Sequence, residues 1–105
     1  FATPFCLIGH THIPITYHTN NGKSSLSAVS SDNPLSFKLT GRAILNPGSV
    51  GQPRDADSRA CYAILDLTDK TWDLRRVSYD ISSVQQRILR CGLPTRNGDR
   101  LMGGW

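Results

Sequence analysis

Two histidines near the start of the chain, His10 and His12, stand one residue apart in the segment FCLIGHTHIPITYH. In an extended chain, residues i and i+2 point to the same side, with Cα atoms roughly 6.5 Å apart at about 3.3 Å per residue. Their imidazoles could therefore converge on one metal ion, or serve two metal ions about 3.5–4 Å apart. The alternative is a pair of solvent-facing histidines in a surface loop. His18 has no partner at a useful spacing, and we interpret it as a surface residue.

The segment ILNPGSVGQPRD is the second candidate for chemistry. Its residues Asn46 to Ser49 predict a tight turn after an apolar strand, in which the Asn46 side chain hydrogen-bonds the backbone locally. Ser49 and the nearby backbone N–H groups could hold an anion or support a bound ligand, although a purely structural turn is the favoured interpretation for Ser49. Arg54 could pair bidentately with phosphate, or merely support a neighbouring loop, and both alternatives stay open.

The elements that must position these residues are predicted to be mostly antiparallel strands, followed by one C-terminal helix, which is an α+β fold. Asp80 predicts the helix N-cap, and Gly92 and Pro94 predict its end. The tail 96–105 could add a helical turn, which its glycines disfavour. Alternation and turn residues predict strands at 4–8, 13–18, 23–30, 35–39, 42–45, 59–67 and 71–80, hairpin turns at 20–22 and 69–70, and loops at 31–34 and 46–58.

The overall composition limits which binding partners and which cellular compartment we expect for this chain. The chain has 105 residues, enough for one small domain. No run approaches the roughly 18 apolar residues of a membrane helix, and no signal-peptide pattern is present, so we expect no membrane partner. Three widely spaced cysteines favour a reducing, cytoplasmic compartment. A net charge of +4 suits a phosphate-bearing ligand, but the basic residues are dispersed, so nucleic acid is not the expected partner.

Three motifs together resemble a known family. LIGHTHIP, ILNPGSVGQPRDADSRACYAILDL and WDLRRVSYDI occur in this order, followed by a helix that ends in GLP. Over nearly its whole length, the chain resembles the C-terminal half of a calcineurin-like metallophosphoesterase. The branch most similar is that of the small prokaryotic phosphoesterases, described as phosphodiesterase-like or diadenosine-tetraphosphatase-like.

The resemblance implies part of a β-sandwich flanked by helices, and a metal-dependent hydrolase of phosphomonoesters or phosphodiesters. It implies two divalent transition-metal ions (Mn, Fe, Zn, Co or Ni), one bound by His10 and the other by His12. Asn46, Ser49 and Arg54 are then candidates for contacting the substrate or for supporting the metal ligands.

The remaining metal ligands of the family come from D-x-H, G-D-x-x-D and G-N-H motifs, none of which occurs in this sequence. We therefore expect residues 1–105 to form the C-terminal half of a single metallophosphoesterase domain, inactive by itself. The expected partners are the N-terminal half of the same protein, a small phosphoester substrate and, as a further possibility, a second copy of the chain.

Two other functions stay open at this stage. The first is a non-catalytic scaffold or protein-binding module on the same fold, because a fold does not fix a function. The second is a small phosphate- or nucleic-acid-binding β domain that is complete in itself. The strands at 4–8 and 59–67 have the apolar pattern of strands buried on both faces. We therefore expect the chain alone to expose an apolar patch and an unpaired sheet edge near residues 4–8.

Overall fold

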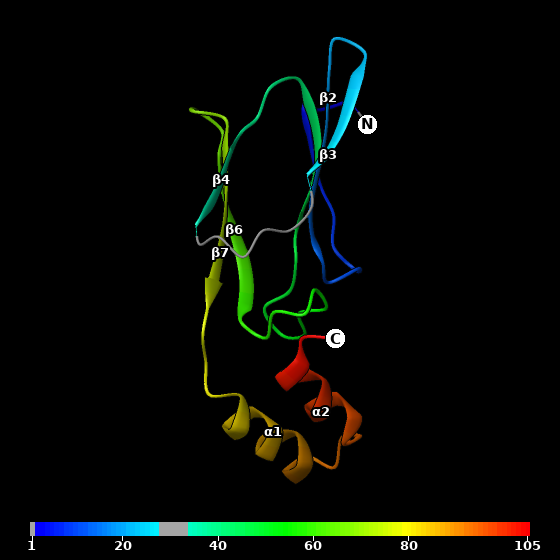
Figure 1. Ribbon diagram of the computed structural model, residues 1–105, viewed down its shortest axis with the longest axis vertical. Helices are drawn as coiled ribbons and strands as arrows, with labels where there is room; N and C mark the ends of the chain where they lie inside the picture. The colour runs from blue at the N-terminus through cyan, green and yellow to red at the C-terminus, as the bar shows by residue number, and fades with distance from the viewer. Residues whose placement is uncertain (1, 28–33) are drawn as a thin grey trace.

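Two β-sheets face each other, and two helices lie beyond one end of them, in a computed structural model that describes residues 2–27 and 34–105 (Figure 1). The molecule is elongated and measures 51 × 25 × 21 Å. The strand order of the first sheet is β1-β5-β2-β3, with bounds Phe5–Leu7, Arg42–Pro47, Pro14–Asn20 and Lys23–Ser27. The order of the second sheet is β4-β7-β6, with bounds Leu35–Lys38, Thr71–Val77 and Ala60–Asp66. The helices are α1 (Ile81–Arg90) and α2 (Arg96–Gly103).

Strand pairing is antiparallel except between β1 and β5, which run parallel. The predicted hairpin between β2 and β3 is confirmed, and its turn residues Asn21 and Gly22 both have positive φ, 49° and 76°. A two-residue hairpin turn of type I′ requires this conformation at both positions, which Asn-Gly adopts readily. The predicted β6–β7 hairpin is also confirmed. The predicted strand end at 28–30 and most of the loop at 31–34 lie outside the described residues.

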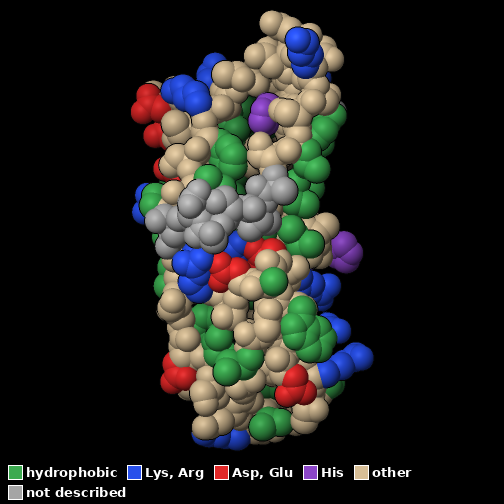
Figure 2. Space-filling model, in the orientation of Figure 1, with side chains coloured by type: hydrophobic (Ala, Val, Ile, Leu, Met, Phe, Trp, Pro, Cys, Tyr) green, Lys and Arg blue, Asp and Glu red, His purple; other side chains and the backbone are tan. Residues whose placement is uncertain are grey.

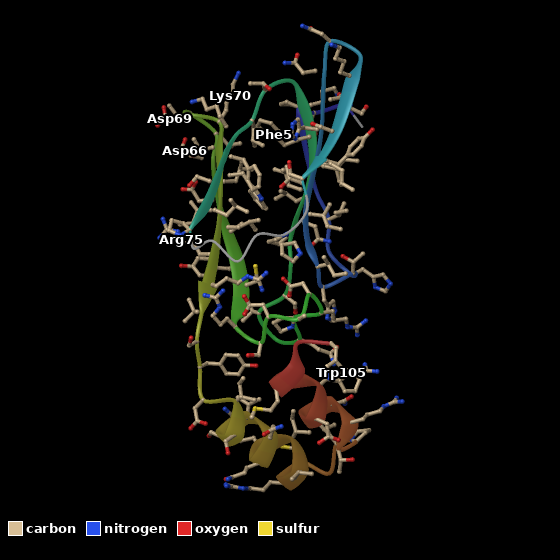
Figure 3. All side chains as sticks on the ribbon, in the orientation of Figure 1. Phe5, Asp66, Asp69, Lys70, Arg75 and Trp105 are labelled. Atoms are coloured by element: carbon tan, nitrogen blue, oxygen red, sulfur yellow. The ribbon has the colours of Figure 1, made fainter. Side chains whose placement is uncertain are left out.

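The hydrophobic core lies between the two sheets. Leu45 from β5 is fully buried, and Trp72 and Leu74 from β7 are 3% and 6% exposed. Phe5, labelled in Figure 3, packs against this core from β1. Burying one such large side chain contributes about 1.5–3 kcal/mol. The apolar contact between the two sheets is therefore the main source of stability in the β-strand region.

Each sheet buries one face among the described residues and leaves apolar side chains exposed on the other, as expected for this chain taken alone. In β6, Cys61 faces the core, whereas Ile64 on the opposite face is 44% exposed. Leu7 and Ile8, at the end of β1, are 60% and 46% exposed. Hydrophobic side chains are correspondingly visible along the side of the molecule formed by the first sheet (Figure 2). The expected unpaired edge near residues 4–8 is confirmed, since β1 pairs with β5 alone within the described ranges.

The C-terminal region holds two helices, which corrects the prediction of one. The first follows the prediction: the Asp80 side chain accepts a hydrogen bond from the backbone N–H of Ser83 at 3.0 Å. The second forms despite its glycines because it packs against the first, where Gln85 Nε2 donates to the carbonyl of Gly98 at 2.9 Å. Tertiary packing often outweighs a weak helix propensity in this way. Neither helix of the described chain has the length and apolar character that crossing a membrane requires.

Candidate metal centre

The two candidate metal ligands lie in the connection between β1 and β2, residues 8–13, at the end of the sheets nearer the helices (Figure 1). This connection is not extended, so the same-side argument based on a strand is wrong here. His10 and His12 both have positive φ, 76° and 62°, and the backbone N–H of Thr11 donates to the carbonyl of Gly9 at 3.0 Å. The histidines themselves therefore make the turn. Positive φ is uncommon for residues other than glycine, and such backbone strain is concentrated at functional sites.

The His12 ring is fixed by a hydrogen bond to the loop that follows β5. Its Nδ1 atom lies 2.8 Å from the backbone carbonyl oxygen of Gln52. A carbonyl can only accept, so in the neutral ring Nδ1 carries the proton and Nε2 keeps its lone pair. The backbone is held too, because the N–H of Arg54 donates to the carbonyl of His12 at 3.2 Å. Histidines that bind a metal ion through one ring nitrogen commonly donate the N–H of the other ring nitrogen to a carbonyl in this way, and that hydrogen bond fixes the orientation of the ring.

His10 and His12 differ in their surroundings. The His12 side chain is half-buried against the Gln52 loop, whereas His10 is exposed at the tip of the turn. Their side chains therefore stand at different depths in the same turn.

Asn46, at the end of β5, stabilises the turn that contains His10 and His12 through hydrogen bonds from its side chain. It is 1% exposed, and its Nδ2 atom donates to Thr11 Oγ1 at 2.9 Å and to the carbonyl of Gly9 at 3.3 Å. Its Oδ1 atom accepts the backbone N–H of Gly48 at 3.0 Å. One buried amide thus joins the histidine turn to the turn that follows β5.

The other two predicted residues also belong to this second turn. Ser49 Oγ accepts the backbone N–H of Gln52 at 2.9 Å, which is the purely structural role considered for it. Gly48 has φ of +80°, and a Cβ there would lie 3.1 Å from Pro14 and 3.2 Å from Cys61, so both conformation and space favour glycine. Arg54 is exposed, and its Nη2 atom donates to Gln52 Oε1 at 2.8 Å.

Hydrogen bonds through Gln52 join three of the five predicted site residues, His12, Ser49 and Arg54, into one network. Asn46 bonds the adjoining residues Gly9, Thr11 and Gly48, and His10 lies exposed beside them. Sequence reasoning missed Gln52, which accepts from His12, donates to Ser49 and accepts from Arg54. Two of these three contacts use its backbone, and no side-chain type predicts a backbone contact.

The set of possible metal ligands is incomplete in the part of the chain that the structure describes. No group of three or more His, Cys, Asp or Glu side chains converges there, whereas four ligands are usual for a bound zinc ion. His12, with Nε2 available, fits a metal ion. His18 does not belong to this network: its Nε2 atom lies 2.6 Å from Ser25 Oγ on the paired strand β3, an exposed contact that agrees with its interpretation as a surface residue.

Comparison with known proteins defines the class of fold. The crystal structure of a metallophosphoesterase from Sphaerobacter thermophilus matches the whole of this chain with a TM-score of 0.89 and 35% sequence identity, and the match covers 44% of that chain. The fold is therefore that of part of a metallophosphoesterase, and the predicted α+β class is confirmed.

The sequence comparison finds a relative that is longer than this chain. The uncharacterized protein MJ0912 of Methanocaldococcus jannaschii is 35% identical over 97 residues, which is 92% of this chain and 38% of that protein. The chain thus spans less than half the length of both proteins. No protein-family model matches the sequence.

Proposed function

We propose that the chain belongs to the calcineurin-like metallophosphoesterases and forms the C-terminal half of their catalytic domain. The complete polypeptide then hydrolyses a phosphomonoester or phosphodiester, in the manner of the small phosphodiesterase-like enzymes. The observation that carries the proposal is the 2.8 Å contact from His12 Nδ1 to the Gln52 carbonyl, which leaves Nε2 free to bind a metal. The likeness to a metallophosphoesterase supports it independently.

Each residue of the network has a role in this proposal. His10 and His12 bind two divalent transition-metal ions, for which imidazole suits Mn, Fe, Zn, Co or Ni. When bound, such metals supply an activated water and neutralise charge on the phosphoryl oxygens. Asn46 and Gln52 hold the histidine turn in place. Arg54, exposed next to His12, presents its guanidinium to a phosphate oxygen of the substrate, and its contact with Gln52 restricts its rotation.

The other metal ligands come from a preceding part of the same polypeptide. The edge strand β1 is parallel to its neighbour and exposes Leu7 and Ile8, so it can accept a further strand and an apolar cover. The proteins that this chain resembles have more than twice its matched length, which provides such a segment. The alternative is that a second copy of the chain covers this strand edge and its exposed apolar side chains. The cysteines Cys6, Cys61 and Cys91 are free, which agrees with a cytoplasmic, reducing location.

The test measures hydrolysis of bis-p-nitrophenyl phosphate by the complete polypeptide with Mn²⁺. Replacing His10 or His12 by alanine should lower kcat by orders of magnitude and remove part of the bound metal, measured by elemental analysis, because each change leaves one metal under-coordinated. His18→Ala is the matched control, since this histidine hydrogen-bonds Ser25 outside the network. Residues 1–105 alone should show only background turnover. Unchanged turnover and metal content in both His10→Ala and His12→Ala would refute the assignment.

A further inference from the structure

A buried ion pair lies beneath the loop that orients His12. Asp55 belongs to this loop and Arg76 to β7 of the other sheet, and their side chains are 3% and 4% exposed. The pairing is two-pronged: Arg76 Nη1 donates to Asp55 Oδ1 at 3.3 Å, and Arg76 Nη2 donates to Asp55 Oδ2. Because neither charge can be left alone in such surroundings, the pair holds Asp55 in one place relative to the second sheet.

Three residues connect the anchored Asp55 to the contact with the His12 ring. The residue before Asp55 is Arg54, whose backbone N–H donates to the carbonyl of His12. Next comes Pro53, which is buried and has a restricted φ. The third is Gln52, whose carbonyl accepts from His12 Nδ1. A shift of Asp55 is therefore transmitted to the carbonyl that selects which nitrogen of His12 carries the proton.

We propose that Asp55 and Arg76 are positioning residues for His12: their buried pair holds the Gln52 carbonyl where it fixes the His12 ring and turns Nε2 outward. The pair acts across the two sheets, because Arg76 comes from one sheet and His12 precedes β2 of the other. The effect of this positioning on catalysis rests on the proposed function. The effect of the ion pair on the orientation of the His12 ring does not.

The same loop offers a matched control. Asp57 and Arg59 form a second ion pair, Asp57 Oδ2 to Arg59 Nη2 at 2.6 Å, with side chains 21% and 32% exposed. This pair lies on the far side of Asp55 from Gln52 along the chain. Asp57 also stands 3.8 Å from Arg76, so the control variant changes Arg59 and leaves both carboxylates in place.

The experiment measures the tautomer of His12 by its side-chain ¹⁵N shifts in the metal-free complete polypeptide, at a pH where the ring is neutral. The parent protein should show mainly the Nδ1–H form. In Arg76→Met the ratio of Nδ1–H to Nε2–H should fall about two- to tenfold, which is the worth of one hydrogen bond. Arg76→Lys should restore part of it, because lysine keeps the charge but not the two-pronged contact. Arg59→Met should change nothing.

A second set of variants covers the case in which Arg76→Met does not fold. Asp55→Asn keeps the shape of the side chain and removes its charge, and the double variant Asp55→Leu, Arg76→Met removes both charges together with their burial cost. Folded Asp55→Asn or double-variant protein should show the same change in tautomer ratio. An unchanged ratio in either of them, with folding verified by a cooperative thermal transition, overturns the proposal.

Failure of this proposal can be distinguished from failure of the proposed function. The tautomer measurement uses neither metal nor substrate, so it reports on the positioning alone. If the parent protein fails to bind Mn²⁺ while the tautomer ratio changes as expected, the proposed function is wrong and the positioning role stands. If the enzyme is active, Arg76→Lys should lower kcat with little change in KM, because the substrate itself does not contact this pair.

Discussion

Replacing Asn46 with alanine should destabilise the protein through the loss of a single buried amide. Its side chain makes three hydrogen bonds, to Gly9, Thr11 and Gly48, and it is 1% exposed. Truncation leaves the partly buried N–H of Gly48 without its acceptor, whereas the exposed Gly9 and Thr11 can bind water instead.

The magnitude follows from this difference in exposure. A buried donor without a partner costs about 1–3 kcal/mol, and each of the other two bonds contributes about 0.5–1 kcal/mol. The expected loss is therefore about 2–5 kcal/mol in the free energy of unfolding. With a urea dependence of about 2 kcal/mol per molar, in the middle of the usual range, the midpoint of unfolding should fall by about 1–2.5 M.

Urea unfolding of the complete polypeptide measures the effect, and a double-mutant cycle isolates one bond. Asn46→Ala and Thr11→Val together should show a coupling of about 1 kcal/mol, because their side chains share the 2.9 Å bond. Asn20→Ala, at the exposed end of β2, is the control and should change stability by less than about 0.5 kcal/mol. A loss no larger than that of the control, or a coupling near zero, would show that this amide does not hold the turn.

Two further predictions concern titratable groups. Cys91 is exposed and should be alkylated by iodoacetamide in the native protein well before Cys61, which is buried and whose thiol pKa is raised by that burial; mass spectrometry showing equal rates would contradict this. The hydrogen bond from Arg59 lowers the pKa of Asp57 from 3.8 to about 2, so Asp57 stabilises the fold above about pH 4 and this contribution is lost as the pH falls towards 2. The stability difference between the parent and Arg59→Met should therefore shrink over that range, and a difference that is constant with pH would refute the link.

Features with short-range causes could be predicted from the sequence. Asn21 and Gly22 adopt positive φ at little cost, so they determine the β2–β3 turn wherever the strands lie. Asp80 caps α1 through a contact only three residues away, at Ser83. The pattern of β6, which is apolar on both faces, predicted a strand but not which of the two faces packs against the core of this chain.

The helix α2 and the histidine turn could not be predicted in the same way. The glycines of α2 disfavour a helix, and only its packing against α1 reverses that preference. The extended conformation assumed for His10 and His12 gave way to a turn because Asn46, more than thirty residues later in the chain, binds the backbone at Gly9 and the side chain of Thr11.

The sequence by itself therefore determined which residue types are available for metal and phosphate chemistry, namely the two histidines and the NPGSVGQPR segment that follows β5. Only the tertiary structure decided how they are connected. Gln52 binds the His12 ring through a carbonyl 40 residues away, and Arg76 pairs with Asp55 across 21 residues. Such contacts depend on how the two sheets pack. Every residue has a carbonyl and many have a charge, so residue type alone does not show which of them will meet.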